Sequence, residues 1–347
     1  MKKERTAYIG ILQIIRLFAA SMIILYHTGL VGSHGYFGVQ IFFVLSGFLA
    51  YITTRKPVSA GRYLIRRLIR LVPLYWIFTV LTFVLLTVRP GLSNMSDGEP
   101  LHFLLSLLFI PYRGNAGHIL PILAVGWTMQ YEICFTLLFT LSLLISHRFR
   151  GLICSLLLLA LLAAGLWMKH DSLFIRFYTD RHLFDFLLGL LAGFAWLKLR
   201  DAVPEDRPVL SGLSGFPRAL VTAVLSLLAL GSLIFLLANG QFPVKLHQAV
   251  RYGIPALVLI FTLLLLLERV YFPPKLLMLC NMTYSIFLVE YFTTSVYKRL
   301  VPGPMSLPLT VLSVAALFAV TFGLSLIPYC LIEVSLTSRL KRALLRS

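Results

Sequence analysis

The sequence predicts an all-α integral membrane protein with ten transmembrane helices, and three observations predict it. Hydrophobic residues make up 59% of the 347 residues, against about 45–50% in an ordinary soluble domain. Charged residues make up only 13%, and the mean hydropathy is +0.89. Ten apolar runs are long enough to span a bilayer, which takes about 20 residues. This composition excludes an ordinary soluble enzyme, whose surface needs more charge than this chain supplies.

The expected helices follow one another along the whole chain. They occupy residues 7–31, 36–54, 68–88, 127–146, 150–168, 181–198, 219–237, 250–268, 281–299 and 308–335. Charged stretches or Pro- and Gly-rich stretches separate them. An eleventh apolar run, 101–110, is too short to span, so we expect a re-entrant or interfacial segment there.

The first run is preceded by positive charge, as a secretory signal would be. Lys2, Lys3 and Arg5 come before it, but the run is too long for a signal peptide, and Gln13 and Arg16 interrupt its core. We therefore expect a first helix that is retained in the mature protein.

The loop charges predict the orientation. The net charge is +18, from 31 Lys and Arg against 13 Asp and Glu. In a soluble protein that excess would suggest nucleic acid, but beside apolar spans it is typical of the inner membrane surface. With the N-terminus inside, 21 Lys and Arg fall on the inner side and nine on the outer side. We therefore expect both termini in the cytoplasm.

We expect one transmembrane domain over residues 1–347, with no appended soluble domain and no internal repeat. The longest outer loop, 89–126, has the Pro- and Gly-rich composition of an irregular lid. Its polar residues line either an outward-facing site or an ordinary solvated loop; they are His102, Tyr112, Arg113, Asn115 and His118. The four cysteines lie in apolar runs without metal-ligand spacing, so we expect buried thiols, no disulfide and no metal site. They are Cys134, Cys154, Cys280 and Cys330.

Five ionisable residues stand out within the expected spans: Arg16, His27, Glu132, Asp185 and Glu290. Each costs about 2.5–3.5 kcal/mol to insert into a membrane, so each is a functional candidate. Arg16 and His27 are eleven positions apart, which returns to within about 20° of the same helical face and rises about 16 Å. One face would then carry a cation in the inner half and a titratable base near the outer end. The alternative is that Arg16 pairs with Glu290 and that His27 sits at the interface.

Glu132 enters the membrane from the same outer side as His27. A carboxylate there could orient the imidazole and stabilise its protonated form. The alternative is that Glu132 pairs with an arginine or with backbone groups of a neighbouring helix. Asp185 follows Arg181 by one turn, so we expect a local ion pair between these two residues.

The inner end of the third helix is rich in arginine. Arg62, Arg66, Arg67 and Arg70 precede Pro73 within nine residues of one another. The positive charge typical of inner loops explains some of these arginines. The alternative is a phosphate-binding site, because guanidinium groups bind phosphate bidentately and Arg67 and Arg70 recur on one helical face.

The second helix contains the small residues Ser46 and Gly47 at its centre. They permit the close approach of a ligand or of another helix. Ser46 is not expected to be a nucleophile, because no base lies beside it and the α/β-hydrolase elbow is absent.

Together these stretches resemble the integral membrane acyltransferase-3 family, by motif and by order. The matching segments are Arg16 to His27, Phe42-Phe43-Val44-Leu45-Ser46-Gly47-Phe48, the group Arg67, Arg70, Pro73 and Tyr75, and Trp127-Thr128-Met129-Gln130-Tyr131-Glu132. Three positions depart from the family pattern. Gln40 stands where an acidic residue is frequent, Thr136 where a tyrosine is common, and Glu290 where the family has a late histidine.

The resemblance implies a membrane O-acyltransferase, most simply an O-acetyltransferase of polysaccharide biosynthesis in the bacterial inner membrane. Acyl-CoA, most simply acetyl-CoA, would be the cytoplasmic donor substrate, and an extracytoplasmic or lipid-linked glycan the acceptor, with no permanently bound cofactor. His27 would be the general base, with Glu132 and Arg16 as the other catalytic residues. Arg67, Arg70, Tyr75 and Ser46 would contact the donor. Transfer of succinyl or a longer acyl chain stays open, and so does a transporter or flippase, although inverted repeats are missing.

Overall fold

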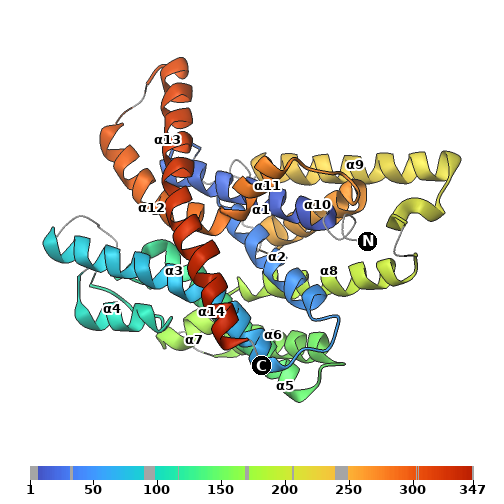
Figure 1. The fold of residues 1–347 in the computed structure, drawn as a ribbon, viewed down its shortest axis with the longest axis horizontal. Coiled ribbons are helices and arrows are strands. Elements are labelled where there is room, and N and C mark those ends of the chain that lie inside the picture. Colours follow the sequence, from blue (N-terminus) through green and yellow to red (C-terminus); the bar gives the residue numbers. More distant parts are fainter. Residues whose placement is uncertain are drawn as a thin grey trace. The chain divides into compact units, whose positions relative to one another are not determined.

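The computed structural model confirms that the protein is helical (Figure 1). It describes residues 7–31, 34–89, 98–115, 117–168, 172–204, 207–238, 249–301, 303 and 305–345. Several residues of the loop-charge count lie outside these ranges: Lys2, Lys3, Arg5, Lys169, Lys245 and Arg346. Part of the expected outer lid, residues 90–97 and 116, also lies outside the described residues. An isolated antiparallel bridge joins Arg113 and Ile119 of that loop.

Contacts divide the chain into two compact units. Unit 1 comprises Met1–Lys56 and Phe184–Thr283, and unit 2 comprises Pro57–Leu183 and Tyr284–Ser347. Each unit is therefore built from two segments that are distant in the sequence. The expectation of a single domain stays a prediction.

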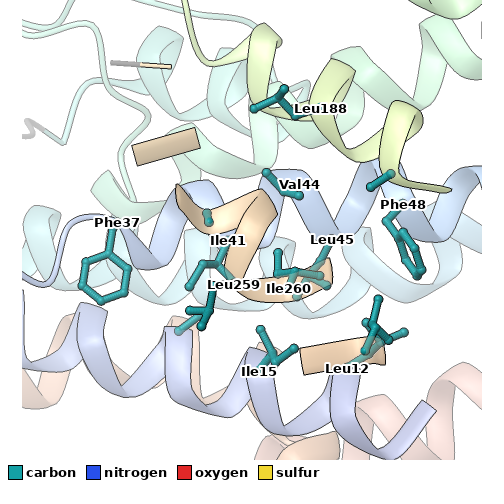
Figure 2. Close-up of a cluster of buried hydrophobic side chains, with 14 of the residues drawn as sticks. Leu12, Ile15, Phe37, Ile41, Val44, Leu45, Phe48, Leu188, Leu259 and Ile260 are labelled. Atoms are coloured by element: carbon teal, nitrogen blue, oxygen red, sulfur yellow. The ribbon is translucent and has the colours of Figure 1, made fainter. Parts of the chain in front are cut away.

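Unit 1 is a bundle around α1 and α2. Its helices are α1 (Ala7–Thr28), α2 (Gly38–Thr53), α8 (Leu183–Asp201, from its second residue on), η3 (Val209–Gly212), α9 (Gly215–Ala238), η5 (Ala249–Gly253), α10 (Ile254–Leu267) and α11 (Pro274–Asn281). The helix α1 packs against α2, α10 and α11, and α10 also packs against α9 and α2. Figure 2 shows the apolar core that these helices share, to which Leu12, Ile15, Ile41, Val44, Leu45, Leu188, Leu259 and Ile260 contribute.

Unit 2 is built around α3. Its helices are α3 (Ala60–Val88), α4 (Pro100–Leu107), η2 (Ala124–Gly126), α5 (Trp127–Ile145), α6 (Arg150–Trp167), α7 (Leu173–Tyr178), α12 (Thr283–Leu300, from its second residue on), α13 (Leu307–Pro328), η6 (Tyr329–Leu336) and α14 (Thr337–Leu344). The helix α3 contacts α4, α5, η6 and α14, and α5 packs against α6. The segments α13, η6 and α14 continue one into the next, as the red ribbon of Figure 1 shows.

Every apolar run of the sequence contains a helix in the structure, but the count of ten spans is not confirmed. Eight helical segments in the described residues are long and apolar enough to cross a membrane, and nine if the broken pair α11 and α12 is one span. The helix α2 has only 16 residues, which is short for a span. The run at 101–110 contains α4, which has eight residues and cannot span, as expected.

Several helices are apolar but little buried within the protein. Only 11% of the most apolar window of α9 and 17% of that of the segment Leu307–Leu344 are buried. A helix that is apolar on all sides needs an apolar surrounding, which is typical of a membrane span.

One expected boundary and one expected burial are wrong. The third helix begins at Ala60 rather than at residue 68, because the Ser59 side chain caps it by accepting a hydrogen bond from the Arg62 N–H at 3.3 Å. The arginine-rich stretch is therefore helical. Among the cysteines, Cys330 is exposed on η6 instead of buried, while Cys154 and Cys280 are buried and Cys134 is partly buried. The side of η6 at Cys330 and Leu331 packs against little protein.

Candidate functional site

In unit 1, a single continuous helix carries Arg16 and His27, as the sequence predicts. Both side chains are partly buried, and the His27 ring lies 5.3 Å from the Tyr26 ring, measured between centroids. His27 lies in the last turn of α1, where the helix dipole favours a positive charge. The role of His27 as general base stays a prediction.

The small residues of α2 serve helix packing. A Cβ on Gly47 would lie 2.2 Å from the Phe186 carbonyl oxygen, and a Cβ on Gly189 would lie 2.1 Å from the Val44 carbonyl oxygen. The two glycines thus let the backbones of α2 and α8 touch. Close helix packing, one of the two alternatives, accounts for Gly47. Ser46, which is 8% exposed, stays a predicted donor contact.

Asp185 is buried in unit 1, at 1% exposure. A Cβ on Gly253 would come within 2.3 Å of its Oδ1 atom. The carboxylate therefore lies directly against the backbone of η5, and its expected pairing with Arg181 stays a prediction.

In unit 2, Glu132 pairs with an arginine of the neighbouring helix. Arg67 Nη1 donates to Glu132 Oε1 at 3.1 Å, and the side chains are only 13% and 8% exposed. The Arg67 guanidinium carbon also lies 5.5 Å from the centroid of the Tyr63 ring. This is the pairing weighed above as the alternative for Glu132. Its proposed action on His27 stays a prediction.

Arg67 and Arg70 lie on one helix but have different surroundings. Arg67 is held by Glu132 and Tyr63, whereas the Arg70 side chain is exposed. Arg70 is also close enough to Glu333 to interact with it electrostatically. Of the two arginines, Arg70 is therefore the more accessible to a phosphate.

Glu333 is a charged residue of this cluster that the sequence analysis did not single out. Its Oε1 accepts hydrogen bonds from the Ser285 N–H at 2.9 Å and from the Ser285 hydroxyl. Ser285 lies in the first turn of α12, where a carboxylate is stabilised by the helix dipole. The sequence does mark Glu333 as a candidate, because it is an acidic residue inside the last expected apolar run. It lies in the π-helical segment η6, a geometry that is frequent at functional sites.

Tyr75, an expected donor contact, is completely buried. Its hydroxyl donates to the Ser106 carbonyl at 3.1 Å, and its ring stacks on Phe109 with centroids 4.7 Å apart. A Cβ on Gly126 would lie 2.5 Å from the Tyr75 ring. These contacts give Tyr75 a structural role in holding α4 and η2 against α3.

Polar residues of the loop expected on the outer side stabilise the conformation of that loop. The His102 ring is buried and its Nε2 bonds to the Leu120 carbonyl at 2.8 Å. The Ile122 N–H donates to the Ser106 hydroxyl at 2.9 Å, and the Tyr112 hydroxyl donates to Glu99 at 3.0 Å. These hydrogen bonds hold the described part of the loop against α4.

The comparisons with known proteins decide the family. A family model described as an acyltransferase domain, the acyltransferase-3 model, matches residues 9–330. The chain belongs to the acyltransferase-3 family. The match includes Arg16, His27, Ser46, Arg67, Arg70, Tyr75 and Glu132.

Two curated relatives are similar over part of their length. The exopolysaccharide production protein ExoZ of Rhizobium meliloti is 35% identical over 167 residues, which are 47% of this chain and 51% of ExoZ. The O-acetyltransferase OatA of Staphylococcus aureus is 32% identical over 230 residues, which are 58% of this chain and 38% of OatA. The chain thus spans about half the length of one relative and less of the other. No solved structure matches the chain.

Proposed function

We propose that the protein is a membrane O-acyltransferase that moves an acyl group, most simply acetyl, from cytoplasmic acyl-CoA to a glycan hydroxyl. The observation that carries the proposal is the family match over residues 9–330. One relative is called an O-acetyltransferase and the other an exopolysaccharide production protein. A glycan that faces outward or is attached to a lipid is the proposed acceptor.

The proposed topology is ten spans in the bacterial inner membrane with both termini in the cytoplasm. The helices found in all ten apolar runs support the count. The excess of Lys and Arg on one side supports the orientation. In this orientation the inner end of α3 with Arg67 and Arg70 faces the cytoplasmic donor, and the last turn of α1 with His27 faces the acceptor side.

In the proposed reaction His27 removes the proton from the acceptor hydroxyl. The hydroxyl oxygen attacks the thioester carbonyl, an ester bond forms, and the carbon–sulfur bond breaks. The departing coenzyme A thiolate then takes up the proton. Arg16, on the same helix as His27, positions the carbonyl or phosphate groups of the donor. Ser46 and Tyr75 are proposed donor contacts, and Tyr75 also holds α4 and η2 against α3.

Donor binding in this proposal relies on charge at the inner end of α3. The exposed Arg70 binds coenzyme A phosphate groups, because a guanidinium group matches phosphate oxygens bidentately. Arg67, which is paired with Glu132, is the second proposed contact of the coenzyme A phosphate groups. Glu132 fixes Arg67 and, as proposed from the sequence, favours the imidazolium form of His27.

The test uses purified protein in lipid nanodiscs with radiolabelled acetyl-CoA. The acceptor is surface polysaccharide of the producing cell, treated with mild alkali to remove its O-acyl groups. We expect release of coenzyme A and labelling of the polysaccharide, both dependent on acceptor and on His27. Translocation of the polysaccharide without acyl transfer would contradict the proposal and favour a flippase.

A further inference from the structure

A cluster of aromatic and polar side chains lies in unit 2, apart from the arginine and glutamate residues described above. Trp127 and Tyr131 are one turn apart on α5, and the His182 ring lies 4.9 Å and 5.3 Å from their rings. Tyr131 also stacks on Phe177 of α7, with centroids 4.3 Å apart and an interplanar angle of 12°. The cluster therefore joins α5, α7 and the turn before α8 into one partly buried aromatic wall.

Asp180 fixes the His182 ring within this cluster. The Asp180 Oδ1 atom lies 2.5 Å from His182 Nδ1 and also accepts the His182 backbone N–H at 3.0 Å. An ionised carboxylate only accepts hydrogen bonds, so Nδ1 carries the proton. The remaining ring nitrogen, Nε2, is then an acceptor in the neutral ring and a donor in the charged ring. This arrangement makes the imidazole an oriented polar group on an apolar wall.

Gln130 adds a second, independent observation. It is 1% exposed, and neither its Oε1 nor its Nε2 atom has a hydrogen-bond partner among the residues that the structure describes. At about 100° per residue, it lies about 60° from Trp127 on the helical wheel of α5. A buried amide without partners is costly, and most buried polar groups are satisfied. The amide therefore needs a ligand or water.

We propose that Trp127, Tyr131, His182 and Gln130, with Asp180 positioning His182, bind a sugar ring of the acceptor glycan. A pyranose has apolar C–H faces and hydroxyl groups around its edge. The partly exposed Trp127 indole matches such a face, and an amide with one acceptor and two donors matches neighbouring hydroxyls. Binding sites for small molecules combine apolar walls with few oriented polar groups in this way. The inference rests on the proposed acyl transfer to a glycan and assigns the residues that hold its acceptor.

A purely structural explanation makes different predictions for two conservative variants. Asp180 also shapes the start of α8, because its carbonyl accepts the Leu183 N–H at 3.2 Å. Asp180→Asn keeps this carbonyl and a side-chain oxygen for the His182 N–H, but it removes the charge beside the imidazole. Gln130→Met keeps the length of the side chain and removes two unsatisfied polar atoms, so as a core residue it should be neutral or stabilising.

The experiment measures acyl transfer from acetyl-CoA to the alkali-treated polysaccharide in nanodiscs, at varied concentrations of each substrate. We expect Gln130→Met to raise the KM for polysaccharide by about tenfold, the effect of losing one hydrogen bond. Asp180→Asn should raise this KM less, because a neutral amide holds the imidazole more weakly than a carboxylate does. The KM for acetyl-CoA should not rise in these variants, and the melting temperature of Gln130→Met should not fall. Phe174→Leu is the control, because Phe174 is an exposed aromatic residue of α7 outside the cluster.

A second measurement does not depend on catalysis. Tritium-labelled fragments of the same polysaccharide are bound to the immobilised protein without acyl donor. We expect saturable binding that Gln130→Met weakens and Phe174→Leu does not. Wild-type KM and wild-type binding in both cluster variants would overturn the sugar site while leaving acyl transfer intact. An enzyme that binds the fragments through Gln130 but transfers no acyl group would instead overturn the proposed function alone. Absence of both transfer and binding would overturn both.

Discussion

Arg67 and Glu132 form an ion pair at 3.1 Å, although 65 residues separate them in the sequence. The pair joins α3 to α5, and the side chains are 13% and 8% exposed. The pair occupies the Arg67 guanidinium, so Arg70, whose side chain is exposed, is the more accessible of these two arginines. The arginine-rich stretch thus contains at least two kinds of arginine, one that connects helices and one that is open to a ligand.

Breaking this ion pair should destabilise the protein. Removing one partner of a buried pair typically costs about 3–5 kcal/mol, because the other charge stays buried alone. We expect Arg67→Met and Glu132→Leu each to lower the melting temperature markedly. The double variant should be less damaged than the sum of the two, with a coupling of about 0.5–3 kcal/mol.

The measurement is thermal unfolding in one detergent, arranged as a double-mutant cycle. Arg66→Met serves as the control, because Arg66 is exposed on the same helix. It should change stability by no more than about 0.5 kcal/mol. Additive effects of Arg67→Met and Glu132→Leu would contradict the pairing.

The contact between α2 and α8 predicts opposite effects of the same substitution at two glycines. Gly47→Ala would place a Cβ 2.2 Å from the Phe186 carbonyl oxygen, and such overpacking costs about 1–3 kcal/mol. Gly231 of α9 has no neighbouring atom within 4 Å of an added Cβ. Gly231→Ala should therefore be neutral or stabilise by about 0.5–1 kcal/mol, through helix propensity. Melting temperatures of the two variants in the same detergent test this, and equal stability would contradict the close approach.

Arg70 should contribute to donor affinity. A hydrogen bond to a charged group is worth about 1.5–3 kcal/mol, so Arg70→Ala should weaken acetyl-CoA binding about 10- to 100-fold. Arg70→Lys should weaken binding less than Arg70→Ala, because lysine keeps the positive charge but cannot bind phosphate bidentately. Glu333→Gln should strengthen binding, since it removes the nearby negative charge and keeps an acceptor for Ser285.

Calorimetric titration with acetyl-CoA tests these variants, with Arg66→Ala as a charge-matched control on the same helix. An equal loss in Arg66→Ala and Arg70→Ala would show a general effect of positive charge and not a site at Arg70. Wild-type affinity in Arg70→Ala would remove this residue from the donor site.

The helices could be predicted from the sequence because each apolar run is long and is bounded by charge or by Pro and Gly. The start of α3 could not, since a capping Ser59 outside the apolar run extends the helix through the arginines. In the site, the place of Arg16 and His27 on one helix followed from spacing alone. The partner of Glu132 did not, because it depends on which helices pack together.

Two further residues of unit 2 show that the contacts of a side chain could not be predicted from the sequence. Glu333 was visible as a carboxylate in an apolar run, but its contacts with Ser285 depend on how η6 meets α12. Gln130 reads as an ordinary helix residue in the sequence, and only its burial without partners makes it notable. Local patterns thus predict which segments are helical, whereas tertiary packing decides which polar residues meet.

The loop charges predict that both termini face the cytoplasm. A reporter fused after Ser347 should be active only in the form that reports a cytoplasmic location. Cysteine variants within 55–66 should react with a membrane-impermeant reagent only after the membrane is opened. A reporter found outside, or labelling of 55–66 in intact cells, would contradict the orientation. A change in the number of spans by one would then explain the result, and α2 with its 16 residues is the first to examine.

His27 should be required for the chemical step and not for folding. General-base catalysis is worth about 10²–10⁴-fold, so His27→Ala should lower kcat by that factor while acetyl-CoA still binds. His147→Ala is the matched control, because His147 lies in the turn between α5 and α6 and takes no part in the proposed reaction. Glu132→Gln should slow transfer more than it weakens donor binding, since it removes the charge proposed to favour the imidazolium. Single-turnover transfer and donor binding, measured on the same preparations, separate the two effects. A His27→Ala protein that keeps most of its turnover would exclude His27 as the base, even if acyl transfer itself is confirmed.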